Sequence, residues 1–230
     1  VPGKTFRWKG YYGFDLNQAH TLETHLNVFS SFNPEIPESY KDSEYVFLAN
    51  IDPELQMKVL DQVRRPRFVA CDTMNFWIEG KPDALKALLK RVDMFVINEG
   101  EARELAKEAS LVKAAKIILG FGPKMLIIKR GEYGSLLFNG GSVFSAPAFP
   151  LEEIFDPTGA GDSFAGGVMG HLASTGDLGE ANIRKAIIYG SVMASFNVEA
   201  FSLNRLNSLT QEDINTRYSE FKVLTHFEDI

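Results

Sequence analysis

The sequence of 230 residues predicts an α/β fold in which helices cover a mostly parallel central sheet. Short runs rich in apolar and β-branched residues alternate with stretches in which apolar residues recur at helical spacing. A strand–helix–strand–helix order at this spacing is typical of parallel strands that are buried on both faces. The runs that we expect to form the parallel strands are 44–49, 67–71, 93–97 and 124–129.

Helical stretches lie between these runs and follow them. In the stretch 53–63, Val59, Leu60 and Val63 recur at the spacing of one helix face. Pro82 begins a further helix, because proline is well suited to the first helical position. The remaining elements that we expect are helices at 99–107, 112–119, 160–174, 180–196 and 210–221, and a hairpin formed by 134–138 and 142–144.

The residues up to Phe32 differ from the rest because they are rich in aromatic residues, Asn and Thr. This composition predicts β-strands with polar loops, arranged as a small sheet outside the main one. Asn33-Pro34 and Ile36-Pro37 indicate a connection to the following part of the chain. We therefore expect a small β segment at 1–35 and an α/β domain at 36–230.

The composition argues against several classes of function. A formal net charge of −6 does not suit a nucleic-acid binder, which needs a basic surface to displace counterions from phosphates. No apolar run approaches the roughly 20 residues of a membrane-spanning helix, and residues 1–4 begin no signal peptide. The one cysteine, Cys71, lies in an apolar run and is expected in the core of a protein from a reducing compartment. We expect a cytoplasmic protein with a small-molecule partner.

The strongest functional pattern is the string Asp-Pro-Thr-Gly-Ala-Gly-Asp-Ser-Phe at 156–164, which directly precedes an apolar helical run. Its glycines let the backbone approach a ligand, and amides at a helix N-terminus favour an anion. A carboxylate beside such an anion, here Asp162, is useful where it accepts a proton, as in phosphoryl transfer. The alternative is an ordinary helix start with a glycine-rich turn and an acidic cap.

Three weaker patterns follow expected strands. Asn98-Glu99-Gly100-Glu101 offers oxygen ligands that suit Mg²⁺, although acids at the start of a solvated helix explain it as well. The turn Lys129-Arg130-Gly131-Glu132-Tyr133-Gly134 offers cations for phosphates, although a tight hairpin turn with surface cations explains it equally well. Asp72 and Asn75 follow a further expected strand, and a loop cap explains them as well as a ligand site does.

The string at 156–164 resembles the C-terminal signature of the ribokinase-like carbohydrate kinases, also called the PfkB family. The resemblance implies a three-layer α/β sandwich with a small β lid, provided here by the N-terminal segment. It also implies ATP-dependent phosphorylation of a sugar hydroxyl. Asp162 would be the catalytic base, Gly159, Ala160 and Gly161 would form the anion hole, and Thr158 would contact the nucleotide.

The weaker patterns have counterparts in the same family. Asn98 and Glu101 are similar to its Asn-x-x-Glu motif, which implies that both act on Mg²⁺ through water. The glycine turn is similar to one that shapes the ATP site, which implies nucleotide contacts from Lys129, Gly131 and Gly134. Lys129-Arg130 stand where the family more often has Thr-Leu, so a cation would replace a hydroxyl near the phosphates.

The segment 194–201 resembles the part of the family that flanks the adenine, which implies Asn197 as a further nucleotide contact. A monovalent cation such as K⁺ is implied near Asp156, although Ser202 stands where many members have glycine. The lid residues Phe6 and Trp8 are the candidates for substrate contact, and a homodimer could form through the lid.

The resemblance runs from Glu44 to the C-terminus. Members of the family usually begin with strands and a Gly-Gly motif that do not precede the lid here, so we expect a chain that lacks the usual N-terminal part. Two alternatives remain open. The aromatic lid could stack the base of a nucleoside, which would make the protein a nucleoside kinase, or the chain could be a non-catalytic member that senses a ligand.

Overall fold

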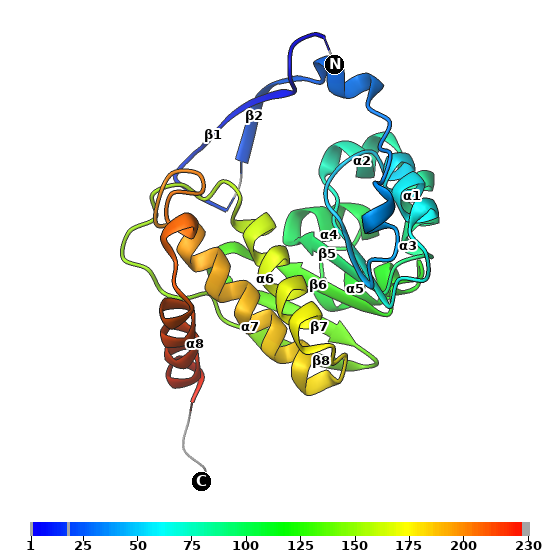
Figure 1. Cartoon of the computed structure of the whole chain (residues 1–230). Coiled ribbons are helices and arrows are strands. Elements are labelled where there is room, and N and C mark those ends of the chain that lie inside the picture. Colours follow the sequence, from blue (N-terminus) through cyan, green and yellow to red (C-terminus); the bar gives the residue numbers. More distant parts are fainter. Residues whose placement is uncertain (1, 18, 227–230) are drawn as a thin grey trace.

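The computed structural model describes residues 2–17 and 19–226, and Val1, Gln18 and residues 227–230 lie outside this description. The described chain forms a six-stranded sheet and a separate two-stranded sheet (Figure 1). The large sheet has the order β3-β4-β5-β6-β7-β8. Its strands are β3 (Tyr45–Leu48), β4 (Phe68–Cys71), β5 (Met94–Asn98), β6 (Met125–Lys129), β7 (Ser135–Asn139) and β8 (Ser142–Ala146).

The large sheet is mostly parallel, as the sequence predicts. Strands β3 to β6 pair in parallel, whereas β7 and β8 pair antiparallel at one edge. The expected hairpin is present, because Asn139 pairs with Ser142 across the two-residue turn Gly140-Gly141. Both glycines have positive φ angles, 52° and 89°, as a tight hairpin turn of this kind requires.

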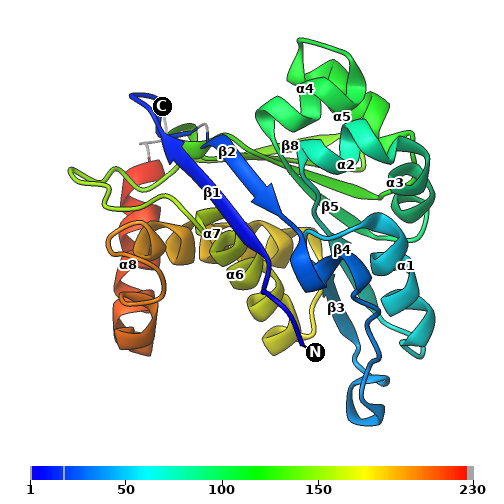
Figure 2. The ribbon, with the colours of Figure 1, turned by 90° about the horizontal axis from the view of Figure 1, so that it is seen from above.

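Helices cover both faces of this sheet and give three layers (Figures 1 and 2). Helices α1 to α5 pack on one face, α6 and α7 pack on the other, and α8 lies outside α7. Side chains that alternate along each strand supply the two cores, so Cys71 belongs to the first core and Ala70 to the second. The helices are α1 (Pro53–Gln62), α2 (Asn75–Gly80), α3 (Pro82–Leu89), α4 (Glu99–Ala106), α5 (Leu111–Leu119), α6 (Ala160–Thr175), α7 (Glu180–Asn197) and α8 (Gln211–Thr225).

The N-terminal segment forms the predicted small sheet, in which β1 (Arg7–Tyr12) pairs antiparallel with β2 (Ala19–His25). The expectation of strands up to Phe32 is wrong for Asn27–Ser31, which form a 3₁₀ helix. The hydroxyls of Ser30 and Ser31 donate to carbonyls three residues earlier, and such local bonds compete with strand pairing.

This two-stranded sheet, the lid, lies over the end of the molecule at which α6 begins (Figures 1 and 2). The division of the chain at residue 35 stays a prediction. Among the described helices, none combines the length and the apolar character needed to cross a bilayer.

Candidate active site

The carboxyl ends of β4, β5 and β6 meet the N-terminus of α6 at one edge of the sheet. Asp72 follows β4, and the last residues of β5 and β6, Asn98 and Lys129, are direct partners in the pairing register. Ligands of open α/β sheets bind at this edge, beyond the carboxyl ends of the strands. The fold therefore brings the three weaker sequence patterns to the strongest one.

The string at 156–164 forms a tight turn that leads into α6. Gly159 is the N-cap with a φ of 84°, a conformation that favours glycine. The amide of Ala160 donates to the carbonyl of Pro157 at 3.2 Å. Among the described residues, the amides of Gly161 and Asp162 donate no backbone hydrogen bond, as is usual in a first helical turn. These two amides and the positive end of the helix dipole are available to an anion.

Asn197, at the end of α7, holds this turn in shape. Its side chain is buried, its Nδ2 donates to the carbonyl oxygen of Thr158 at 2.9 Å, and its Oδ1 accepts a hydrogen bond from Ser163 at 2.9 Å. The amides of Phe155 and Asp156 donate to the carbonyl of Val198 nearby. The structure thus uses Asn197 within the protein, as a support for the turn.

Asp162 lies in the first turn of α6, and its side chain is exposed. The ammonium group of Lys129 lies against the preceding residue, because a Cβ at Gly161 would stand 2.6 Å from Nζ of Lys129. Glycine at position 161 therefore leaves room for this ammonium group. An exposed carboxylate, two open amides and a cation occupy the same helix end.

Asn98 and Glu101 form a capping box at the start of α4. Oδ1 of Asn98 accepts from the amide of Glu101 at 2.8 Å, and Oε2 of Glu101 accepts from the amide of Asn98 at 3.0 Å. Glu101 is buried, and this burial raises the pKa of its carboxyl group, while the Asn98 amide and Lys129 act in the opposite direction. Both residues therefore have a structural role, and their action on Mg²⁺ stays a prediction.

The turn after β6 needs both of its glycines. Gly131 and Gly134 have φ angles of 55° and 81°, and a Cβ at Gly134 would stand 2.0 Å from the carbonyl oxygen of Ala146. A Cβ at Gly131 would stand 1.6 Å from Oδ1 of Asn17 in the lid. The turn is therefore shaped by close contacts on both sides.

Asp72 differs from the other polar residues at the strand ends. It is 5% exposed, and its Oδ1 has no hydrogen-bond partner among the described residues. Burial raises its pKa to about 7; Lys129 opposes this effect, whereas Asp162 and Glu101 add to it. Asn75 is the first residue of α2, and its side-chain amide donates to Glu104 of α4 at 2.6 Å, so it joins two helices and forms no loop cap.

The two residues predicted to contact substrate, Phe6 and Trp8, pack against other residues of the N-terminal segment. Phe6 packs edge-on against Phe29, and the indole of Trp8 donates to Thr21 at 3.0 Å. The lid residue that reaches the string at 156–164 is Tyr12, whose hydroxyl lies 3.5 Å from Oγ1 of Thr158. No sequence pattern singled out this hydroxyl for contact with the turn.

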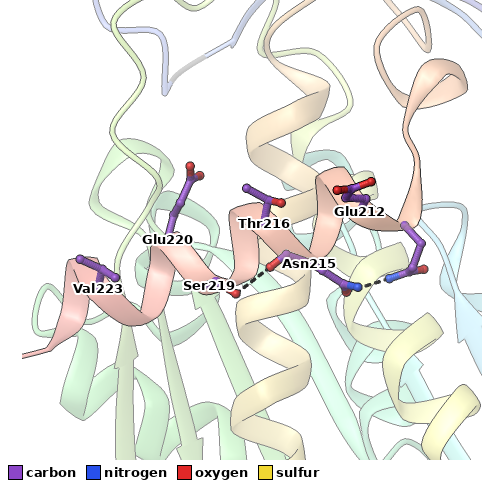
Figure 3. A pocket seen from close by; sticks show the side chains of 7 residues that line it. Glu212, Asn215, Thr216, Ser219, Glu220 and Val223 are labelled. Carbon is purple, nitrogen blue, oxygen red and sulfur yellow. Dashed lines mark hydrogen bonds between the residues drawn. The ribbon is translucent and has the colours of Figure 1, made fainter.

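The hollows on the surface of the described residues include one on α8 and one beside the string at 156–164. The first is lined entirely by α8, where Ser219 donates to the carbonyl of Asn215 and Gln211 donates to the side chain of Asn215 (Figure 3). A groove lined by one outer helix, in which Gln211 and Ser219 both bond to Asn215, lacks the features of a catalytic site. The second borders the string at 156–164 and is lined by Glu153, Ile154, Phe155 and Glu199.

Mg²⁺ bound mainly by phosphates and water fits these residues better than a metal held by protein ligands alone. Within the described residues, no three His, Cys, Asp or Glu side chains group as a metal cage. Mg²⁺ commonly keeps several waters and uses one or two carboxylates together with substrate phosphates. Glu101, with a buried carboxylate at the strand edge, suits such a role.

Comparisons with known proteins agree with this geometry. Two curated relatives are a cytidine kinase from Thermococcus kodakarensis, 34% identical over 173 residues, and a nucleoside kinase from Thermoplasma acidophilum, 32% identical over 197 residues. The matches cover 74% and 84% of this chain but only 62% and 61% of the relatives. The chain therefore spans about three fifths of the length of these relatives.

The fold is shared with solved structures as well. A ribokinase from Thermotoga maritima superposes with a TM-score of 0.74 at 22% identity, over 95% of this chain and 71% of that one. The family model described as pfkB family carbohydrate kinase matches residues 17–210. The fold is thus shared with a solved ribokinase, and the chain belongs to the pfkB family of carbohydrate kinases.

Proposed function

We propose that the protein transfers the γ-phosphoryl group of ATP to a hydroxyl of a small sugar, with Asp162 as the base. One observation carries this proposal: the first turn of α6 combines an exposed carboxylate with two open amides, and the ammonium group of Lys129 lies against Gly161 in the same turn. The open amides and the ammonium group stabilise negative charge on the phosphoryl group, and the carboxylate accepts the hydroxyl proton.

The remaining residues support this arrangement. Asn98 and Glu101 would act on Mg²⁺ through water, and the bound ion would supply charge neutralisation between the ATP phosphates. Gly131 and Gly134 would shape the nucleotide site beside Lys129. Asn197 would act on the nucleotide through the turn that it holds, because both ends of its amide are bonded inside the protein.

A nucleoside is the second candidate for the acceptor. It is favoured by the names of the two curated relatives, a cytidine kinase and a nucleoside kinase. The aromatic residues of the lid, including Tyr11, which is 53% exposed, would offer rings on which a base could stack. A K⁺ site near Asp156, a homodimer through the lid and a cytoplasmic location remain predictions from the sequence.

The test uses purified full-length protein, a panel of sugars and nucleosides, and an assay of ADP release with ³¹P NMR of the product. The acceptor with the highest kcat/KM decides between sugar and nucleoside. Binding of ADP without turnover on any acceptor would support the non-catalytic alternative and contradict the proposal.

Asp162→Asn identifies the base in the same assay. We expect turnover to fall by about 10²–10⁴-fold, since this is the usual effect of losing a general base, with ADP affinity within a few-fold of wild type. Glu212→Gln is the matched control, because Glu212 is also an acid in the first turn of a helix, α8, away from the site. Retention of more than about a tenth of wild-type turnover by Asp162→Asn would remove Asp162 from this role.

A further inference from the structure

The site contains one buried charged group to which the proposed function gives no role, the carboxyl group of Asp72. This residue is 5% exposed, and its Oδ1 has no hydrogen-bond partner among the described residues. Burial of a carboxylate oxygen without a partner is unfavourable, and a backbone hydrogen bond at Asn50 offsets the effect of burial on the pKa of Asp72 only in part.

Asp72 and Lys129 face the same side of the sheet. Ala70 in β4 and Ile127 in β6 both pack in the core beneath α6 and α7. Because side chains alternate along a strand, Asp72 and Lys129, each two residues further on, face α6 as well. The strand geometry continues to Asp72, whose amide donates to the carbonyl of Leu48 at 3.3 Å.

Lys129 extends from its strand end to the first turn of α6. A Cβ at Gly161 would stand 2.6 Å from its Nζ, so the ammonium group lies against the open amides of this turn. The charge of Lys129 favours the ionised form of Asp72, whereas Asp162 and Glu101 disfavour it. Among the described residues, Lys129 forms no ion pair within 4.0 Å, so its charge acts on these carboxylates at longer range.

We propose that Asp72 is a positioning residue of the phosphoryl-transfer site and acts through Lys129. Its carboxylate holds the ammonium group at Gly161 and away from the carboxylate of Asp162. The ammonium group is then in place for the transferred phosphoryl group, while Asp162 stays free to accept the proton. This role rests on the proposed function, since it concerns the same site.

The physical reason is a competition between two carboxylates. Without the charge of Asp72, the ammonium group can pair with Asp162, and an adjacent cation makes a carboxylate a weaker base. Loss of the Asp72 charge should leave the affinity for ATP nearly unchanged, because the ammonium group remains near the phosphates. It should lower kcat, because the base is then partly neutralised.

A double-mutant cycle in the full-length protein at pH 8 tests this, with Asp72→Asn, Lys129→Met and the double variant. We expect Asp72→Asn to lower kcat about tenfold, to leave the KM for ATP within about threefold, and to leave thermal stability equal or higher. In the Lys129→Met background, Asp72→Asn should change kcat by less than about twofold, because the residue through which it acts is gone.

Several results would overturn the inference. Asp72→Asn could keep more than half of the wild-type kcat, or its effect could multiply fully with that of Lys129→Met. Lower thermal stability with equal losses of kcat in both backgrounds would make Asp72 a structural residue. Asp72→Ser serves as a second variant with the same expected pattern, and loss of folding in both would also assign a structural role.

Crystal structures of the wild type and of Asp72→Asn test the same point without turnover. We expect Nζ of Lys129 to leave Gly161 and approach the carboxylate of Asp162 in the variant. An unmoved ammonium group would overturn the positioning role. Absence of turnover by the wild type on every acceptor would contradict the proposed function instead, so the two failures are distinguishable.

Discussion

At the scale of single residues, the site gathers carboxylates and one ammonium group at the ends of neighbouring strands. The motif spacings in the sequence identified Glu101, Lys129 and Asp162 as site candidates, and the structure brings them to one edge of the sheet. Asp72 could not be separated from a loop cap in the same way, because no sequence pattern shows that a carboxylate will be buried with one oxygen unpaired. Its significance depends on which groups surround it in three dimensions.

Asp72 should make the stability of the protein depend on pH. Burial raises the pKa of Asp72 from its ordinary value of 3.8 to about 7, so the folded state holds this proton more tightly than the unfolded state. The contribution of Asp72 therefore becomes increasingly unfavourable as pH rises from about 4 to about 7. We expect Asp72→Asn to raise the Tm at pH 8 and to raise it much less at pH 5, as measured by thermal unfolding across this range.

Asp213→Asn is the control with the opposite sign. Hydrogen bonds from Thr210 lower the pKa of Asp213, so its contribution to stability is present at neutral pH and is lost in acid. A difference in Tm between Asp72→Asn and the wild type that stays constant from pH 5 to pH 8 would contradict the raised pKa of Asp72.

At the scale of elements, the sequence predicted the parallel strands, the hairpin of β7 and β8 and the start of α6. Periodicity and glycine placement specify these elements locally. Helix α2 was missed because it has six residues and ends at Gly80-Lys81-Pro82, where breaker residues hide its pattern. The support of the turn by Asn197 was missed as well, because its partners Thr158 and Ser163 lie 39 and 34 residues away in the chain.

The start of α4 allows the predicted Mg²⁺ role to be separated from helix capping. Glu101→Gln keeps an oxygen acceptor for the amide of Asn98 but removes the charge. We expect the Mg²⁺ concentration for half-maximal rate to rise by about threefold or more, because Mg²⁺ favours charged oxygen ligands. The measurement is a titration of Mg²⁺ at a fixed concentration of ATP.

Asp213→Asn serves here too, since Thr210 and Asp213 form the same kind of capping box at the start of α8. This control should leave the Mg²⁺ titration unchanged. If Glu101→Gln also leaves both the titration and the rate unchanged, Glu101 is a helix-capping residue alone.

At the scale of the whole molecule, the lid and the α/β part meet at the turn after β6. Asn17 lies between β1 and β2, and its side chain accepts from the amide of Glu132 at 3.0 Å and donates to Oε1 of Glu132 at 3.2 Å. The sequence predicted a small sheet here from its composition. It could not predict this docking contact, which joins residues 115 positions apart.

This contact should couple lid position to acceptor binding. Asn17→Ala removes two exposed hydrogen bonds, so the free energy of unfolding should change by less than about 0.5 kcal/mol. The docked state of the lid should become less populated, and the apparent affinity for the acceptor falls in proportion to the competent fraction. We expect the KM for the acceptor to rise by about two- to fivefold with a smaller change in kcat, measured in the full-length protein.

Asn215→Ala, the same substitution on the outer surface of α8, should leave both constants unchanged. An unaltered acceptor KM in Asn17→Ala would mean that the lid closes without this contact, and that the close fit of Gly131 around Asn17 serves the shape of the turn alone.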